Sequence, residues 1–224
     1  MISDKAEING WFATPTTLLM LPDHETRNRE LTQLFLEKEQ QGEKFRHHIQ
    51  IPTQRGALFE SRFDLFDWPE APIQRLSDDI HQVLSEFVAS VNNYSTEQML
   101  GFEFFYDSWF HITRTGGYQS IHSHANACWS GIYCVSPGEP SQLNPESGQV
   151  KFYDPRGTGP VMHFDPGNWN LDPRYSLNPV YLDHKAGQLV LFPSWLLHEV
   201  LPYQGKTDRI VVAFNAWMGE VDAE

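Results

Sequence analysis

The residues of this sequence best suited to bind a metal ion are three histidines. His122-Ser-His124 places two imidazoles two residues apart, and His198 follows much later in the chain. On a β-strand, residues two apart share a face and their Cα atoms are about 6.6 Å apart. Two ring nitrogens placed in this way can converge on one ion at about 2.0–2.1 Å. The spacing therefore predicts a metal site formed by His122, His124 and His198.

A cation follows the third histidine. Arg209 stands eleven residues after His198 and begins a strand predicted for residues 209–217. Alternation along this strand places Ile210, Val212, Phe214 and Ala216 on one face, and Arg209, Val211, Ala213, Asn215 and Trp217 on the other. The first face is apolar and must pack, whereas the second suits the lining of a cavity. Because a buried arginine without a partner is very unfavourable, and Asp208 points to the opposite face, an external carboxylate is the expected partner of Arg209.

The chain between this histidine and this arginine is predicted to form a hairpin. Gln204-Gly205-Lys206 has the composition of a turn. A hairpin with its midpoint between Tyr203 and Gln204 would put His198 and Arg209 roughly opposite each other, within side-chain reach.

Short strands from residue 100 onward supply the scaffold for these side chains. Segments rich in β-branched and aromatic residues, separated by Gly and Pro, predict strands at 102–113, 130–135, 149–153, 180–183, 188–192 and 209–217. Many short strands that close on themselves indicate a barrel or a two-sheet jelly roll.

Two amphipathic helices are predicted before these strands. The first runs from an N-cap at Asp23 through about residue 40 and ends at Gly42, and the second spans residues 72–91. Helices first and strands second predict the α+β class, mainly β. The expected organisation is a single domain over residues 1–224, with a mainly helical layer at 1–99, a catalytic core at 100–217 and a tail at 218–224.

Residues 154–179 form a long irregular stretch with five prolines and three glycines. A loop of this length in a compact domain is usually functional or mobile. Two interpretations stay open: a decorated surface loop, or a lid or substrate rim that carries Trp169 and Arg174.

Composition excludes several classes of protein. The 224 residues are 40% hydrophobic and 13% aromatic, too much for a disordered chain. The net charge of −13 repels nucleic acid and anionic membranes. Two cysteines, Cys128 and Cys134, cannot build a disulfide framework and favour a reducing compartment. With acids at its N-terminus and no long apolar run, the protein is expected to be soluble and cytoplasmic.

The motifs as a set resemble the iron(II)- and 2-oxoglutarate-dependent oxygenases, which carry His-x-Asp/Glu, a distal His and a later Arg or Lys on a double-stranded β-helix. Residues 100–217 are more closely similar to a bacterial and phage branch of these enzymes. The matching segments are Trp109-Phe-His111, Gly116-Gly117, His122-Ser-His124, Ser130-Gly-Ile-Tyr133, Gly148 to Phe152 with Asp154-Pro-Arg156, Phe192-Pro-Ser194 to His198, and Arg209 to Phe214-Asn215.

The resemblance implies a jelly-roll, cupin-like double-stranded β-helix with the N-terminal helices packed on its outer sheet. It implies that His122, His124 and His198 bind Fe(II), and that Arg209 binds the distal carboxylate of 2-oxoglutarate. The reaction it implies is oxidative decarboxylation of 2-oxoglutarate to succinate, coupled to oxidation, expected to be hydroxylation, of an unidentified peptide or small-molecule substrate. Further candidates for cofactor binding are Tyr118, Tyr133 and Asn215. Because Asn215 lies about 20 Å from Arg209 along a straight strand, an indirect role is expected for it rather than a contact shared with Arg209.

Two positions depart from the family pattern. His124 replaces the usual carboxylate ligand, so the ion keeps its full double charge and an anionic co-ligand becomes more important. His111 stands where the branch has an asparagine, which leaves its part in cofactor binding open.

Two other classes of function stay open on the residues alone. One is a three-histidine metalloenzyme that does not use 2-oxoglutarate, either a zinc hydrolase or hydratase or a cupin-type dioxygenase or isomerase. The absence of a glutamate within five residues after His124 speaks against a cupin, and Arg209 has no task in a zinc enzyme. The other is a binding module that kept the fold and lost catalysis.

Overall fold

The computed structural model describes residues 10–221 apart from 50, 125, 140, 142, 158–166 and 168. Its helices are α1 (His24–Gln40), α2 (Ala71–Asn92) and α3 (Thr96–Met99), with 3-10 turns at Gly42–Lys44 and Leu65–Asp67. Its strands are β1 (Thr17–Met20), β2 (Gln54–Arg55), β3 (Leu58–Glu60), β4 (Phe102–Thr113), β5 (Tyr118–His122), β6 (Trp129–Ser136), β7 (Val150–Phe152), β8 (Val180–Leu182), β9 (Gln188–Pro193), β10 (His198–Val200) and β11 (Arg209–Glu220).

The strands form two antiparallel sheets. The larger sheet has the order β1-β9-β6-β11-β4-β3 and the smaller sheet the order β2-β5-β10-β7-β8. Strands β4 to β11 supply the two halves of a double-stranded β-helix: β4, β6, β9 and β11 lie in the larger sheet, and β5, β7, β8 and β10 in the smaller. The predicted fold class, mainly β with a jelly-roll core, is confirmed.

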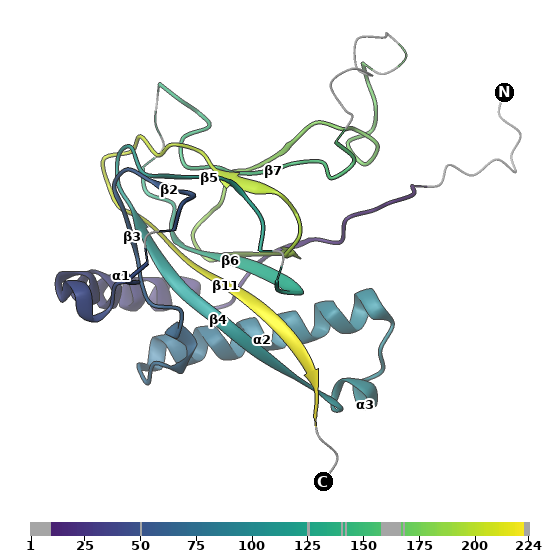
Figure 1. Cartoon of the computed structure of the whole chain (residues 1–224), viewed down its shortest axis with the longest axis horizontal. Helices are drawn as coiled ribbons and strands as arrows, with labels where there is room; N and C mark the ends of the chain where they lie inside the picture. The colour runs from purple at the N-terminus through teal and green to yellow at the C-terminus, as the bar shows by residue number, and fades with distance from the viewer. Residues whose placement is uncertain are drawn as a thin grey trace, which may run out of the picture.

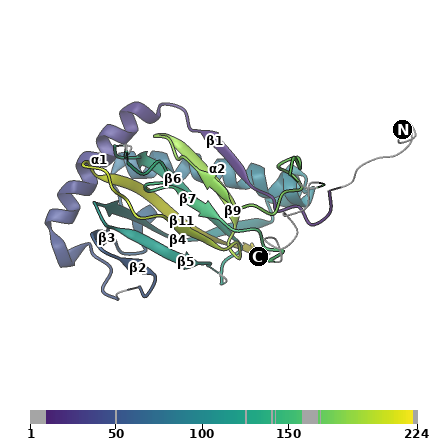
Figure 2. The same ribbon diagram turned by 90° about the horizontal axis from the view of Figure 1, so that it is seen from above.

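The two long helices cover the outer face of the larger sheet, as predicted. Figures 1 and 2 show α1 and α2 on one side of β4 and β11, with β5 and β7 on the other. Phe35 of α1 stacks on Phe110 of β4 with ring centroids 4.1 Å apart. Helix α2 buries a stripe at three- and four-residue steps, formed by Ile73, Leu76, Ile80, Leu84 and Val88. These contacts fix the larger sheet from behind, and its other face is left to line the interior.

The start of the chain differs from the prediction in two respects. Helix α1 begins directly after Asp23, but Asp23 has left-handed backbone (φ 51°) and its side chain caps no helical N–H. The described part of residues 1–99 also contributes three strands, of which β1 extends the larger sheet beside β9. No helix in the described part of the chain is long and apolar enough to cross a membrane.

The glycine pair of the sequence motif turns the chain from one sheet to the other between β4 and β5. Gly116 has a φ of +88°, which favours glycine. A Cβ atom on Gly117 would lie 2.5 Å from the carbonyl oxygen of Ala57. The turn therefore requires both glycines, one for its backbone angle and one for close approach.

The predicted hairpin between His198 and Arg209 is wrong. Strand β10 pairs with β5 and β7 in the smaller sheet, whereas β11 pairs with β4 and β6 in the larger. His198 is the ladder partner of His122, and Arg209 that of Thr113. The connecting residues cross between the sheets, held by backbone hydrogen bonds of Tyr203 to the glycine turn. Turn-like composition identifies a reversal of the chain but not the strand that the returning segment joins.

Candidate active site

The structure brings the three histidines of the sequence pattern together between the two sheets. His122 ends β5 and His198 begins β10, so strand pairing holds them side by side with ring centroids 4.3 Å apart. His124 lies two residues beyond the end of β5, where its backbone N–H donates to the carbonyl of Ser194 at 2.8 Å. Each histidine offers one ring nitrogen, and these atoms lie within 4.8 Å of one another. Such a group can hold one ion and leave further coordination positions open.

The hydrogen bonds of two of these rings prepare them to bind metal. Nδ1 of His122 donates to the carbonyl of Ser120 at 2.7 Å, and Nδ1 of His198 donates to the carbonyl of Leu196 at 2.9 Å. A carbonyl only accepts, so the proton of each neutral ring sits on Nδ1 and Nε2 carries the lone pair. Both rings therefore present a free Nε2.

Burial keeps the three rings neutral. It lowers the pKa of His198 to about 3 and that of His124 to about 4, and repulsion from a proton on His122 would lower both further. Burial also lowers the pKa of His122. A neutral imidazole is the form that ligates a metal, so no proton has to leave near neutral pH.

Arg209 is buried and lacks an anionic partner among the described residues. Arg209 is only 3% exposed, and its Nη2 atom is buried without a hydrogen bond. Burial lowers the pKa of Arg209, which shows how poorly its surroundings solvate the charge. The neighbouring acids are engaged elsewhere: Asp208 pairs with Arg114, and Glu199 pairs with Lys151. An external carboxylate fits the orphaned donor.

The arginine and the histidines line two small cavities that share part of their walls. One small cavity is lined by Arg209, Thr113 and Tyr118, and a second by the three histidines. The residues that line both cavities are His111, Gln119, Ile132, Val200 and Ala213. A short molecule with one end at the histidines and an anionic end at Arg209 would lie along these shared walls.

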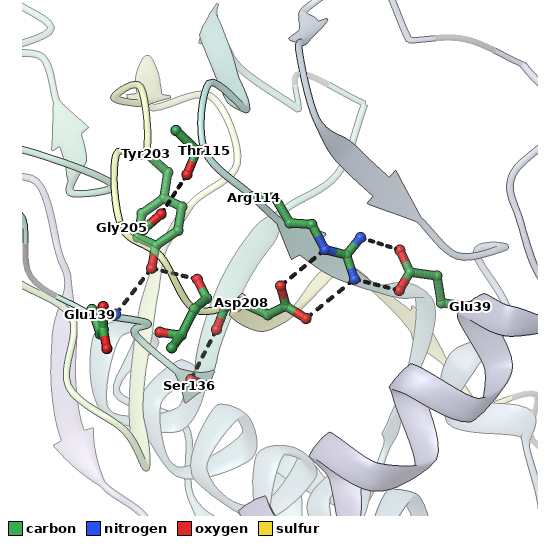
Figure 3. A network of polar contacts seen from close by, with 9 residues as sticks. Glu39, Arg114, Thr115, Ser136, Glu139, Tyr203, Gly205 and Asp208 are labelled. Carbon is green, nitrogen blue, oxygen red and sulfur yellow. Dashed lines mark hydrogen bonds and ion pairs between the residues drawn. The ribbon is translucent and has the colours of Figure 1, made fainter.

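A polar network fixes the crossover that delivers Arg209 (Figure 3). The guanidinium of Arg114 donates to both carboxylate oxygens of Glu39 at 2.6 and 2.7 Å, and also to Asp208 at 3.0 and 3.2 Å. The hydroxyl of Tyr203 donates to the carbonyl of Thr207 at 2.6 Å. Helix α1 is thereby tied to the residue just before Arg209.

Tyr118 lines the same cavity as Arg209, whereas the other two predicted cofactor residues, Tyr133 and Asn215, lie elsewhere. Tyr133 lies on the helix-facing side of β6, where its hydroxyl donates to Asn28 at 2.6 Å. The prediction that Tyr133 contacts the cofactor is therefore wrong, because alternation along β6 turns its ring away from the interior. Asn215 lies on the interior face but next to His124, 3.4 Å from its Nδ1, rather than at the Arg209 end.

Some residues of the site were not predicted from the sequence. Nε2 of His111 lies 2.7 Å from Glu60, and both residues are buried. Trp109, which lines the three-histidine cavity, has a buried indole N–H without a partner. The Trp109-Phe-His111 motif was a signal for two of these residues. Glu60 gave none, because it reaches His111 only through the pairing of β3 with β4.

The long loop is described only in part, since residues 158–166 and 168 lie outside the described residues. Within the described part, Trp169 is exposed and Arg174 pairs with Asp172. Arg174 borders a groove of about 620 Å³ between the segment before β1 and the end of β7. Phe152, in the wall of this groove, has its ring centroid 5.9 Å from that of His198.

Comparison with known proteins agrees with this geometry. Residues 107–215 match the family model described as a putative 2OG-Fe(II) oxygenase. The fold is similar to that of a Pseudomonas putida prolyl-4-hydroxylase, with 18% identity, a TM-score of 0.59 and coverage of 91% of this chain and 92% of that chain. It is also similar to a Trichoplax adhaerens prolyl hydroxylase in complex with a hypoxia inducible factor peptide fragment (16%, 0.57, 92% and 84%). A third similar structure is HygX from Streptomyces hygroscopicus with nickel and 2-oxoglutarate bound (11%, 0.53, 91% and 83%). No curated protein sequence matches the chain.

The fold is a double-stranded β-helix, and its inward-facing imidazoles form a group that can hold a metal ion. Residues 107–215, which include the three histidines and Arg209, match the family of Fe(II)- and 2-oxoglutarate-dependent oxygenases, and the three-histidine group fits an iron site. The family match favours this class over the zinc-enzyme and cupin alternatives and over the binding module without catalysis. The side chains present fit both cofactors, because the histidines offer neutral nitrogen ligands and Arg209 offers a desolvated cation.

Proposed function

We propose that His122, His124 and His198 bind Fe(II), and that Arg209 binds the distal carboxylate of 2-oxoglutarate. The observation that carries this assignment is the buried Nη2 of Arg209, which lacks a partner in a cavity that adjoins the three histidines. When bound, the cofactors would supply the oxidising chemistry. With dioxygen as co-substrate, 2-oxoglutarate would be converted to succinate and CO2, with one oxygen atom entering succinate and the other hydroxylating a C–H bond of the substrate.

The chain's own residues bind and orient the cofactors in this proposal. The guanidinium of Arg209 gives charge-assisted, bidentate hydrogen bonds to a carboxylate, which fixes one end of 2-oxoglutarate. Tyr118 and Thr113 line the same cavity and offer hydroxyl groups to that end. Ile132, Val200 and Ala213 form apolar walls that exclude water between the two ends.

The test is an anaerobic titration of the Fe(II)-loaded chain with 2-oxoglutarate. Chelation of the ion by the cofactor is expected to produce a visible metal-to-ligand charge-transfer band. Succinate release in the presence of oxygen then confirms turnover. Absence of the band, together with tight binding of zinc, would contradict the proposal.

We infer that the substrate is a peptide or a small molecule rather than nucleic acid. The net charge of −13 repels a polyanion, and the groove beside Phe152 is large enough for a small molecule or a side chain. Loop residues 169–178 and the groove are proposed to form the substrate rim. Replacement of Arg174 by alanine would change substrate selectivity without changing 2-oxoglutarate binding, and an altered affinity for 2-oxoglutarate would contradict this.

We also propose that the chain is one domain that works in the cytoplasm. The helices of residues 1–99 share one hydrophobic core with the strands of residues 100–217, which supports a single folding unit. Cys128 and Cys134 are free thiols, as expected in a reducing compartment. A single cooperative unfolding transition and retention of both thiols in protein isolated from cells would test the two points.

A further inference from the structure

The ring nitrogens that face away from the metal site decide which tautomer each histidine adopts. For His122 and His198, Nδ1 donates to the backbone carbonyl two residues earlier, which leaves Nε2 free. The corresponding nitrogen of His124 meets a side chain instead, because it lies 3.4 Å from the amide of Asn215. The tautomer of the third ligand therefore depends on one asparagine.

The amide of Asn215 can present either its nitrogen or its oxygen to His124, because a half-turn of the side chain exchanges the two. With the nitrogen facing the ring, as in the structure, the amide donates to an unprotonated Nδ1. The single proton of the neutral ring then sits on Nε2 and blocks metal binding. With the oxygen facing the ring, Nδ1–H donates and Nε2 keeps its lone pair.

Two buried serines hold the far side of the amide in either orientation. Oγ of Ser130 lies 2.8 Å from Oδ1 of Asn215 and 2.8 Å from Oγ of Ser194. A hydroxyl both donates and accepts, so this chain of hydrogen bonds can reverse its direction without losing a bond. The backbone carbonyl of Ser194 also accepts a hydrogen bond from the backbone N–H of His124 at 2.8 Å. Ring and backbone of His124 are thus tied to the same pair of serines.

We propose that Asn215 is the positioning residue of the third metal ligand, and that its Oδ1 accepts a hydrogen bond from Nδ1–H of His124 in the metal-bound protein. The inference rests on the proposed function, since it requires His124 to bind the metal. Ser130 then accepts from Nδ2 of Asn215 and donates to Ser194. His124 needs this support because it lies beyond the end of β5, where no strand ladder sets its position.

The test is binding of Co(II) alone to the full-length apo chain, followed by calorimetry and by the visible absorption of the bound ion. Asn215→Leu removes the acceptor and is expected to weaken binding by about 10–100-fold, as for other residues that orient a metal-bound histidine. It should also change the Co(II) spectrum. Asn215→Asp is expected to keep wild-type affinity, because a carboxylate only accepts and enforces the required tautomer.

Asn28 of helix α1, which contacts the opposite face of the same sheet, provides a matched control. Its buried amide accepts a hydrogen bond from Tyr133 and lies outside the metal site. Asn28→Leu is expected to lower the melting temperature while leaving the affinity for Co(II) unchanged. Equal losses of affinity in Asn28→Leu and Asn215→Leu would overturn the specific role of Asn215.

Other outcomes separate this inference from the proposed function. Wild-type affinity in Asn215→Leu, or equal weakening by the Leu and Asp variants, overturns the inference while the three-histidine site stands. A wild-type chain that binds no Co(II) overturns the proposed function and this inference with it.

A measurement on the wild-type chain keeps the inference testable even if the variants fail to fold. Long-range nitrogen–proton correlation spectra of the Zn(II)-loaded, 15N-histidine-labelled protein report which ring nitrogen carries the proton. Nδ1–H on all three ligands is the expected result, and a proton on Nε2 of His124 would overturn the proposal.

Discussion

His122 and His198 face each other across β5 and β10, with ring centroids 4.3 Å apart. Because they are ladder partners, backbone pairing positions both rings before any metal binds. His124 lies outside that ladder and depends on side-chain contacts. The three proposed ligands are therefore unequal in how firmly the fold holds them.

Replacement of His198 by alanine is expected to abolish binding of both cofactors. The ion would lose a ligand that the fold holds in place. Loss of a residue that only orients a ligand weakens metal binding by up to about 100-fold, so the affinity for Fe(II) should fall by more than this. Binding of 2-oxoglutarate should fall with it, because the cofactor chelates the ion. Calorimetric titration with each cofactor measures both. His124→Asp, which restores an anionic ligand, is expected to keep Fe(II), and its loss would contradict the assignment of His124.

Replacement of Arg209 by methionine should separate the two cofactors. Loss of a buried, charge-assisted contact is expected to weaken 2-oxoglutarate binding by about 2–5 kcal/mol, while Fe(II) affinity stays unchanged. The apo variant should be at least as stable as the wild type, because a buried charge without a partner is removed. Titration and urea unfolding measure the two effects. Loss of Fe(II) from this variant would contradict the division of roles.

The contact of Arg114 with Glu39 and Asp208 is expected to contribute modestly to stability. The side chain of Arg114 is 44% exposed, so water and salt screen the pairs, and Arg114→Ala should destabilise the chain by about 1 kcal/mol. Urea unfolding at low and high salt measures this, and the difference from wild type should shrink in high salt. The control is Arg174→Ala, which removes the exposed ion pair between Arg174 and Asp172 in the long loop. A loss independent of salt would show that Arg114 acts through packing instead.

The stability of the apo protein should fall below pH 6.5, in part because of His184. Burial, followed by the charge of Arg209, lowers the pKa of His184 to about 3. The unfolded chain then binds a proton that the folded chain does not, so stability is complete above the unfolded pKa and is lost as the pH falls toward 3. His184 is expected to lower the free energy of unfolding by about 1.4 kcal/mol for each pH unit in this range.

The variant His184→Gln should remove that share. A glutamine keeps a donor for the carbonyl of Gln188, which Nε2 of His184 contacts at 2.9 Å. Urea unfolding at pH 7 and pH 5 is therefore expected to show a smaller loss for the variant than for the wild type, by about 2 kcal/mol. Identical pH dependence in the two proteins would contradict a neutral, buried His184.

The two thiols should react at very different rates. Burial raises the pKa of Cys134 to about 12, so its reactive thiolate is scarce near neutral pH. Cys128 is exposed. A thiol-specific dye at pH 8 is expected to label one thiol in the native chain and two in denaturant. Rapid labelling of Cys134 in the native chain would show that β6 opens readily.

Local patterns in the sequence predicted most of the regular structure. The apolar spacing of residues 72–91 predicted α2 to within one residue at each end. Alternation along β11 predicted its two faces, with Ile210 and Phe214 in the core and Arg209 toward the interior. The short strands β5 and β10 were not among the predicted strand ranges, because they span only a few residues, several of them polar, and show no clear alternation.

The sequence by itself identified the candidate metal ligands and Arg209, and spacing along one strand or helix fixed which residues share a face. Only the tertiary structure decided which strands meet. It placed His198 against His122 rather than Arg209, turned Tyr133 toward the helices, and brought Asn215 to His124. The reason is physical: strand register and sheet order depend on contacts between residues far apart in the chain, and no local pattern of hydrophobicity encodes them.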